Sequence, residues 1–342
     1  MKILYAIQGT GNGHLSRAMD IVPALRNHGT VDILVSGTQG DLKLPFPIKY
    51  QFKGLSFIFG KKGGVDLWKT FSHCNPRKLI RNIQELPVEN YDLIINDFEP
   101  VSAWACLLKG KECVSLSHQA AVIHKDYPQP DTIDRKGKLI LQQYAPTNFR
   151  YGFHFRGNGK NIFTPVVRKQ VRDLEISDYG HYTVYLPSYD DKQLIAKLSA
   201  YNVRWDVFSK HNSKMMVHGN VTIQPIDNQK FMQSMASATG VLCGAGFETP
   251  AEALFLGKKL LVIPMKNQYE QELNAAAFKA MGVPVVKSLK EKYEPIISDW
   301  LLSEQKVKVN YPDMTQEIVD RVVAIHSPEY ANLLSLPAQE LL

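Results

Sequence analysis

The sequence of 342 residues lacks the features that mark several large classes of protein. It has only four cysteines, none at metal-binding spacing, so we expect neither a zinc module nor a disulfide framework, and a reduced, cytoplasmic setting is the simplest interpretation. No run of eighteen apolar residues occurs, which excludes a predicted transmembrane helix. With 44% hydrophobic and 21% charged residues, the chain reads as globular and long enough for two domains.

Several ligand-binding motifs are missing as well. The loop at 8–14 follows a predicted strand and is rich in glycine, but His14 stands where the dinucleotide-binding motif requires its third glycine. The second predicted strand, 31–35, ends without an acidic residue for a ribose, and no Gly-Lys-Ser/Thr closes a P-loop. No Asp-x-Asp motif ends a strand. We therefore predict no NAD site, no P-loop and no metal ligands.

The most informative stretch is 241–277. It begins with a short apolar strand and a turn containing Gly244 and Gly246. A helix should follow, with Thr249 as its N-cap, and then a second apolar strand at 260–263. A glycine turn at the carboxyl end of a buried strand, followed by free N–H groups at a helix start, suits a diphosphate.

Polar residues also end two consecutive strands of the first half. They are Asp97 and Glu99 after one strand, and Ser117, His118 and Gln119 after the next. The carboxyl ends of such strands are where α/β sheets bind ligands. Asp97 or Glu99 could accept a proton from a hydroxyl group, or orient His14 or His118. Asp97 and Ser117 could equally well cap the helices that follow.

The stretch 241–277 resembles the donor-binding region of two-domain glycosyltransferases with the GT-B fold. It is most similar to the family 28 UDP-sugar transferases, which include the N-acetylglucosaminyltransferase of peptidoglycan synthesis. The resemblance rests on three features: the pattern Gly246-Phe247-x-Thr249-x-x-Glu252, a strand ending in Pro264, and the pair Glu270-Gln271 ahead of Asn274-Ala275. The first glycine loop, which ends in Gly-His, resembles the corresponding loop of the same enzymes.

This resemblance implies an α/β protein of the GT-B class, with two Rossmann-like domains facing each other across a cleft. Residues 1–165 would form the acceptor-side domain and residues 166–325 the nucleotide-sugar-binding domain. Residues 326–342 would form a C-terminal tail.

The resemblance also implies a role for individual residues. His14 would be the base or an orienting group, in a loop whose Gly11 and Gly13 face the cleft. The donor would be held as follows: ribose by Glu252, diphosphate around Gly244, Gly246, Phe247, Glu248 and Thr249, sugar by Glu270 and Gln271, and base by the backbone near Ile226, with Phe231 packed beside it. Glu248 is an unusual neighbour for phosphate, and relatives often carry His or Arg in place of Gly244. Lys210 could supply the missing positive charge.

The function expected from this resemblance is transfer of a sugar from a UDP-sugar cosubstrate to a sugar or lipid-linked acceptor, with inversion and without a metal ion or prosthetic group. Cell-envelope glycan synthesis would be its setting. The net charge of +7 fits an anionic partner. Aromatic and basic residues at 57–81 fit a peripheral contact with the inner face of the membrane, although a loop and a solvated helix explain them equally well. No nucleic-acid partner is predicted.

Two other functions remain open at this stage. A non-hydrolysing UDP-sugar 2-epimerase would share the fold and the donor site but would need no acceptor. A non-catalytic nucleotide-sugar-binding protein would keep the donor site, and His14 and Asp97 would then be dispensable.

Overall fold

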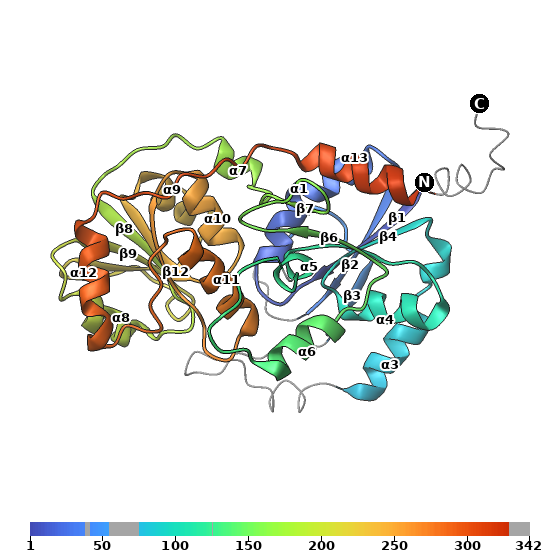
Figure 1. The fold of residues 1–342 in the computed structure, drawn as a ribbon, viewed down its shortest axis with the longest axis horizontal. Helices are drawn as coiled ribbons and strands as arrows, with labels where there is room; N and C mark the ends of the chain where they lie inside the picture. Colours follow the sequence, from blue (N-terminus) through green and yellow to red (C-terminus); the bar gives the residue numbers. More distant parts are fainter. Residues whose placement is uncertain (38–41, 55–74, 125, 328–342) are drawn as a thin grey trace.

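The computed structural model describes residues 1–37, 42–54, 75–124 and 126–327. Two sheets dominate it, with strand orders β3-β2-β1-β4-β5-β6-β7 and β10-β11-β9-β8-β12-β13. Every pairing is parallel except that of β10 with β11. Helices flank both sheets, and the sheets lie side by side along the long axis (Figure 1). The expected α/β class is confirmed.

The first half contains the sheet β1 to β7 and the helices between its strands. The strands are β1 (Lys2–Gln8), β2 (Thr30–Ser36), β3 (Tyr50–Phe52), β4 (Leu93–Asp97), β5 (Val114–Ser117), β6 (Phe149–Phe153) and β7 (Ile162–Phe163). The helices are α1 (Gly13–Arg26), α3 (Pro76–Glu85), η1 (Val88–Asn90), α4 (Pro100–Lys109), α5 (His118–Val122) and α6 (Arg135–Gln143).

The second half contains the sheet β8 to β13. Its strands are β8 (His181–Tyr185), β9 (Arg204–Ser209), β10 (Met216–His218), β11 (Val221–Pro225), β12 (Gly240–Gly244) and β13 (Lys259–Ile263). The helices after residue 165 are α7 (Lys169–Arg172), α8 (Asp191–Leu198), α9 (Asn228–Ser237), α10 (Glu248–Phe255), α11 (Tyr269–Ala280), η2 (Glu291–Tyr293), α12 (Glu294–Leu302) and α13 (Thr315–His326).

Chain order within the two sheets marks where a ligand should bind. In the first sheet the strand order reverses between β1 and β4, and in the second between β8 and β12. Open α/β sheets bind ligands at the carboxyl ends of strands beside such a reversal. The loop that leads into α1 and the turn that leads into α10 are therefore both at the expected positions.

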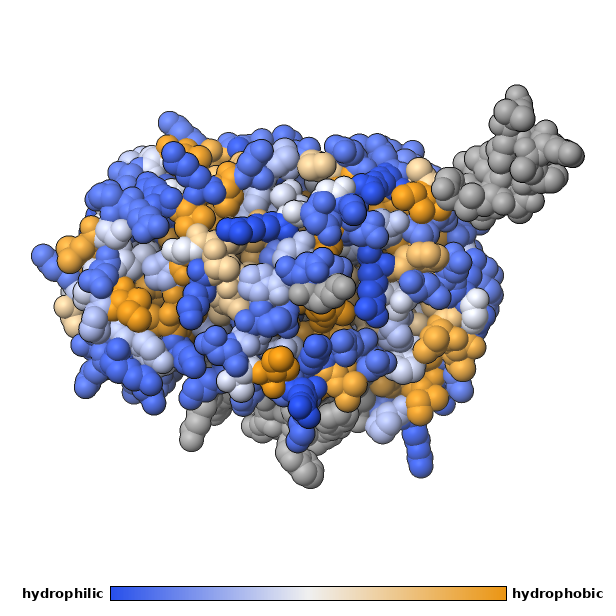
Figure 2. Space-filling model, viewed as in Figure 1, coloured by the Kyte–Doolittle hydropathy of each residue, from blue (hydrophilic) through white to orange (hydrophobic). Residues whose placement is uncertain are grey.

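Apolar side chains join the two halves. The largest buried cluster runs from β1 and α1 through β6 to α10 and α11. Within it, the ring of Phe155 lies 5.0 Å from that of Phe247 and 4.2 Å from that of Phe278. The surface seen in Figure 2 is largely hydrophilic, with small separate hydrophobic patches. The apolar contact between the halves is thus part of the core.

The last described helix crosses back to the first half. Sequence analysis assigned the region up to residue 325 to the second domain, but α13 packs against α1 (Figure 1). His28 lies 2.7 Å from the Asp320 carboxylate, and the Tyr311 hydroxyl donates to the carbonyl of Phe155. The C-terminal segment therefore connects the two halves. The sequence did not reveal this, because the spacing of apolar residues in a helix does not identify the element against which the helix packs.

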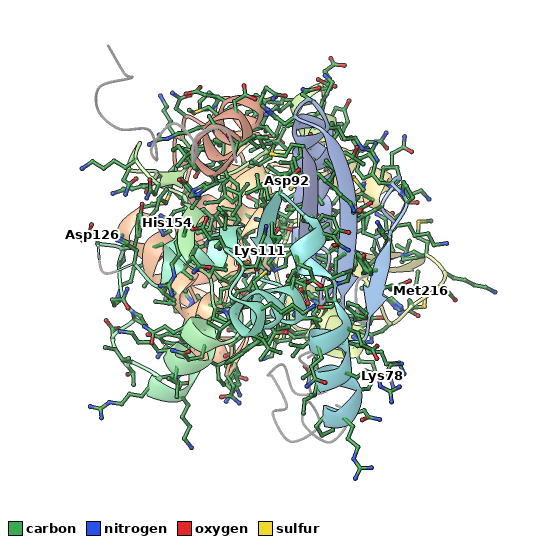
Figure 3. All side chains as sticks on the ribbon, turned by 90° about the vertical axis from the view of Figure 1, so that its right-hand side faces the viewer. Lys78, Asp92, Lys111, Asp126, His154 and Met216 are labelled. Carbon is green, nitrogen blue, oxygen red and sulfur yellow. The ribbon has the colours of Figure 1, made fainter. Side chains whose placement is uncertain are left out.

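Other sequence predictions agree with the structure only partly. Helix α10 begins at Glu248, one residue ahead of the predicted N-cap Thr249. Helix α6, which begins after Asp134, was not predicted from the sequence. Asp126 and His154 lie on the same side of the molecule in Figure 3. Residues 55–74, which carry most of the aromatic and basic stretch, and 328–342, nearly all of the expected tail, lie outside the described residues.

The packing of α13 predicts a measurable loss of stability. Ile318 is 2% exposed on this helix. Its replacement by alanine should lower the free energy of unfolding by about 2–5 kcal/mol, because a buried isoleucine leaves a cavity. Urea unfolding followed by circular dichroism measures it, with the neighbouring Glu317→Ala as control. Equal stability of the two variants would contradict the docking of α13.

Candidate active site

The centre of the site is a contact between His14 and Asp97. His14 is in the first turn of α1, directly after β1, and Asp97 is the last residue of β4, paired with Ile7 of β1. His14 Nδ1 lies 2.8 Å from Asp97 Oδ1. Because the carboxylate can only accept, Nδ1–H donates and the lone pair of Nε2 is left for another partner.

Arg17 completes this group, and sequence analysis missed it. It lies one turn after His14 on the same face of α1. Its NH2 group donates to both oxygens of Asp97, at 2.8 and 2.9 Å, and its Nε donates to Oδ2 at 3.2 Å. Its NH1 group donates to Oε1 of Glu248, in the other half, at 2.6 Å. A histidine with an arginine three residues later at a helix start was the signal that could have revealed it.

Two residues that follow the carboxyl end of β4, Phe98 and Glu99, have unusual surroundings. Phe98 has φ of 57°, a left-handed conformation that is uncommon for a bulky residue and often found at functional sites. Glu99, next to it, is fully buried and accepts hydrogen bonds from the backbone N–H of Val101 and Ser102. Of the open alternatives, Glu99 therefore caps α4 while Asp97 orients His14.

Burial and charge set the ionisation of the pair. Burial raises the pKa of Asp97, but Arg17 and His14 outweigh it and hold the pKa below its ordinary value of 3.8. Burial likewise lowers the pKa of His14, but the Asp97 carboxylate outweighs it, so this pKa lies above 6.5. Asp97 is thus ionised, and His14 is a stronger base than an isolated imidazole.

A cavity of about 370 Å³ opens beside His14, within the range of small-molecule sites. Both halves and α6 line it; the residues are Gln8, Thr10, His14, Phe98, Gln119, Asp134, Lys136, Gly137, Ile140, Leu141, Asn267, Gln268, Tyr269 and Glu270. Side-chain oxygens of Gln8, Thr10, Gln119, Gln268 and Tyr269 are buried without a hydrogen-bond partner. Buried polar atoms are normally paired, so these atoms are suited to a ligand.

The pair Glu270-Gln271 lies on the second-half side of this cavity. Glu270 Oε2 accepts a hydrogen bond of 2.9 Å from Gln119 Nε2, and burial raises the pKa of Glu270. The same Gln119 nitrogen is 3.4 Å from His14 Nε2. Gln271 is buried, and its Oε1 accepts from the N–H of Met265. Glu270, unlike Gln271, thus lines the cavity that His14 lines.

His118 lies in the contact between the halves. Its Nδ1 is 2.8 Å from the carbonyl oxygen of Phe153, and its Nε2 is 2.7 Å from the side-chain amide of Asn274. The ring of Phe247 stacks on it, with centroids 3.8 Å apart. Burial lowers the pKa of His118 to about 3. Because both ring nitrogens are engaged within the protein, His118 has no nitrogen left to act as a base on a substrate.

Glu252, the residue assigned to the ribose, forms a buried ion pair. Arg168 donates to both of its oxygens, through Nε at 2.5 Å and NH2 at 2.7 Å. Arg168 also donates to Oδ1 of Asn228 at the start of α9. A ribose would have to share or displace Arg168, so this role stays a prediction. Arg168 precedes α7 in a charged stretch that gave no sign of its partner.

The other predicted donor residues are spread over the second half. Lys210 is exposed at the end of β9, and β8 separates that strand from β12. Ile226 lies between β11 and α9, and the ring of Phe231 packs against those of Tyr185 and Phe208. The structure instead offers Arg17 as a positive charge beside the turn ahead of α10, because its guanidinium lies over the ring of Phe247 and donates to Glu248.

The glycines of the loop before α1 and of the turn before α10 differ in how much room surrounds their Cα atoms. Gly11 has φ of 87°, which favours glycine, and Gly13 has no room for a Cβ because the Glu248 carboxylate is against it. A Cβ on Gly244 would lie 3.5 Å from Gln271, whereas Gly246 faces open space. Thr249 follows in the first turn of α10. The backbone at Gly246 is thus open to a close approach, whereas the Glu248 carboxylate fills the space beside Gly13.

The described part of the chain shows neither a cluster of metal-binding side chains nor a helix that could span a membrane. Within the described ranges, no group of three or more His, Cys, Asp or Glu side chains could hold a metal ion. None of the helices in the part of the chain that the structure covers is long and apolar enough to cross a membrane.

The first prediction for the site concerns the pKa of His14. In Asp97→Asn the carboxylate that raises this pKa is gone, so the pKa should fall, since burial then dominates. A pH titration of the imidazole signals by NMR measures it. Asp92→Asn, at the residue directly before the same strand (Figure 3), is the matched control. A folded Asp97→Asn protein with an unchanged His14 pKa would contradict the assigned pairing.

A second prediction concerns the buried Arg168–Glu252 pair. Glu252→Ala should lower the free energy of unfolding by about 3–5 kcal/mol, because Arg168 is left uncompensated. The double replacement Arg168→Met with Glu252→Leu should recover most of that loss. Urea unfolding measures both, with the exposed Glu175→Ala as control. A loss below about 1 kcal/mol, the value of an exposed ion pair, would contradict this account of the Arg168–Glu252 pair.

Comparisons with known proteins agree with the fold. The chain is similar over 94% of its length to MurG of Acinetobacter baumannii, with 15% identity, 98% of that chain covered and a TM-score of 0.53. UGT89C1 of Arabidopsis thaliana, complexed with UDP-L-rhamnose, shows 13% identity over 95% of this chain and 98% of its own, with a TM-score of 0.57. The glycotransferase of kitacinnamycin is 11% identical over 98% of this chain and 99% of its own, with a TM-score of 0.56. These likenesses confirm the GT-B fold.

A search among curated proteins finds none that matches the chain. A family model described as glycosyl transferase family 1 matches residues 1–302. The finer likeness to family 28 is not confirmed by that model. The match covers most of both halves, including the His14 loop and the turn ahead of α10, and shows that the chain belongs to glycosyl transferase family 1.

Proposed function

We propose that the protein transfers a glycosyl group from a UDP-sugar to an acceptor hydroxyl, with His14 as the general base. The observation that carries this proposal is the orientation of His14. Its Nδ1 is held by Asp97, and its ring lines the cavity. An imidazole fixed by a carboxylate on one nitrogen, with its other nitrogen able to accept a proton, is the arrangement of a general base.

The transfer step follows from this arrangement. The acceptor oxygen attacks the anomeric carbon of the donor sugar and forms the new glycosidic bond. The bond between that carbon and the phosphate oxygen breaks, and its electron pair leaves with UDP. The hydroxyl proton passes to Nε2 of His14, while Asp97 stabilises the imidazolium. Attack opposite the leaving group inverts the anomeric carbon.

The donor is assigned to the second half. Glu270 lines the cavity and can accept hydrogen bonds from sugar hydroxyls, whereas Gln271 is buried and accepts from the N–H of Met265. The turn 244–247 ends at the start of α10, where backbone N–H groups favour phosphate. The UGT89C1 structures with UDP-L-rhamnose and with UDP support a uridine donor, and we extend that donor to this chain.

The acceptor is assigned to the part of the cavity between the His14 loop and α6. Phe98, Ile140 and Leu141 give this wall an apolar surface, while Gln8 and Thr10 supply polar atoms near His14. UGT89C1 also has a structure with quercetin, 13% identical to this chain, which supports an acceptor beside the donor. A place in cell-envelope glycan synthesis stays a prediction from the family 28 resemblance.

The main test is the variant His14→Ala. It should lower kcat by about 10²–10⁴-fold, the usual contribution of a general base, and leave the affinity for UDP nearly unchanged. Steady-state release of UDP and calorimetry measure the two quantities. His218→Ala replaces an exposed histidine of the second half and is the control. Loss of UDP affinity without loss of kcat would assign His14 to binding.

A thermal-shift screen tests the donor itself. UDP and UDP-sugars should raise the midpoint of unfolding, because a ligand that binds only the folded state stabilises it, by about 2.7 kcal/mol at a hundredfold excess over Kd. GDP, ADP and dTDP are the comparison ligands. Stabilisation by one of these and not by UDP would contradict the uridine assignment. Conversion of UDP-N-acetylglucosamine without any acceptor would instead indicate an epimerase.

A further inference from the structure

The carboxylate of Glu248 lies where the N-terminus of α1, in the first half, approaches the N-terminus of α10, in the second half. Glu248 is the first residue of α10, and its Oε1 accepts a hydrogen bond of 2.6 Å from NH1 of Arg17. Its Oε2 is pressed against Gly13, the first residue of α1, where even a Cβ would collide with it. An anionic group from one half thus lies between the starts of both helices and a buried guanidinium.

The surroundings of this carboxylate attract negative charge strongly. Neither N-cap residue caps its helix with a side-chain hydrogen bond: the side chain of Asn12, ahead of α1, accepts from the N–H of Leu42 instead, and Phe247, ahead of α10, has no polar side-chain atom. The first N–H groups of both helices therefore rely on other partners, and both helix dipoles are positive here. Arg17 adds a full charge and is only 1% exposed. Three sources of positive potential meet at one place.

We propose that Arg17 binds the diphosphate of the nucleotide donor, and that Glu248 is an internal anion that occupies this position until the donor displaces it. The inference rests on the proposed function, since it assumes a nucleoside diphosphate donor. It explains why an acidic residue lies in a turn that is expected to hold phosphate. It also supplies the positive charge that the sequence around Gly244 lacks.

The contacts of Arg17 allow this exchange. Its Nε and NH2 groups hold Asp97, which is fully buried, whereas only NH1 holds Glu248. Glu248 is 20% exposed and belongs to the opposite half, so it can turn away while the pair with Asp97 remains. A diphosphate on NH1 would then lie next to the residue that orients His14, as transfer requires.

The exchange predicts that removing the internal anion improves binding. Glu248→Gln keeps the shape of the side chain but removes the charge that competes with phosphate. It should lower the Kd for UDP by about 10-fold or more, the value of one hydrogen bond to a charged group. The Kd for uridine, which carries no phosphate, should not change. Isothermal titration calorimetry with both probes measures the difference.

Two further variants complete the experiment. Arg17→Lys leaves a charge for Asp97 but is too short to reach a second anion as well, so it should raise the Kd for UDP about 10-fold and leave that for uridine unchanged. Glu272→Gln removes one negative charge from α11, away from the contact, and should change neither value. Thermal unfolding confirms that each variant is folded.

The outcomes separate the inference from the proposed function. An equal or weaker affinity of Glu248→Gln for UDP would overturn the inference while leaving the uridine site intact. Equal gains for UDP and uridine would also overturn it, because the effect would then be opening of the cleft and not competition with phosphate. Absence of UDP and uridine binding to every form would overturn the donor assignment itself, and this inference with it.

Discussion

The buried pair of Arg17 with Asp97 is the interaction on which the rest of the site depends. Asp97 is fully buried, and an ionised carboxylate in that place is tolerated only because Arg17 donates to both of its oxygens. The same carboxylate fixes Nδ1 of His14 and raises its pKa. Since a buried pair costs desolvation energy that a hydrophobic pair would not, stability alone does not account for it, and orientation of His14 does.

The pair is also connected to the contact between the two halves. Arg17 reaches Glu248 across the cleft, and Gln119 reaches Glu270 in the same direction. Phe247, beside Glu248, stacks on His118 and is packed within the core. Two hydrogen bonds between the halves, Arg17–Glu248 and Gln119–Glu270, therefore lie at the cavity, while apolar packing around Phe247 also joins the halves. A donor that replaces one of these hydrogen bonds need not disturb the apolar packing, so binding can alter the cleft without unfolding the interface.

Much of this could be predicted from the sequence, and the remainder shows where local patterns end. Apolar runs and glycine turns located β1, β12 and the helices after them, because these signals depend on neighbours in the chain. The pairing of His14 with Asp97 was predicted only as one of several alternatives, since nothing in the sequence favours it over pairings with Glu99 or His118. Arg17 and Arg168 were missed, because a buried arginine is recognised only by the distant carboxylate that compensates it. Glu252 and Gln271 were expected to face a ligand, yet the folded chain supplies their partners. The packing of α13 against α1 was not foreseen for the same reason.

A crystal structure of the protein with UDP tests the central claim most directly, because it locates the donor relative to His14. The account predicts the diphosphate between the starts of α1 and α10, with one phosphate oxygen on NH1 of Arg17 and the carboxylate of Glu248 turned away. The terminal phosphate should then face the cavity that His14 lines. A nucleotide bound elsewhere, with the Arg17–Glu248 contact unchanged and His14 remote from the phosphate, would contradict it.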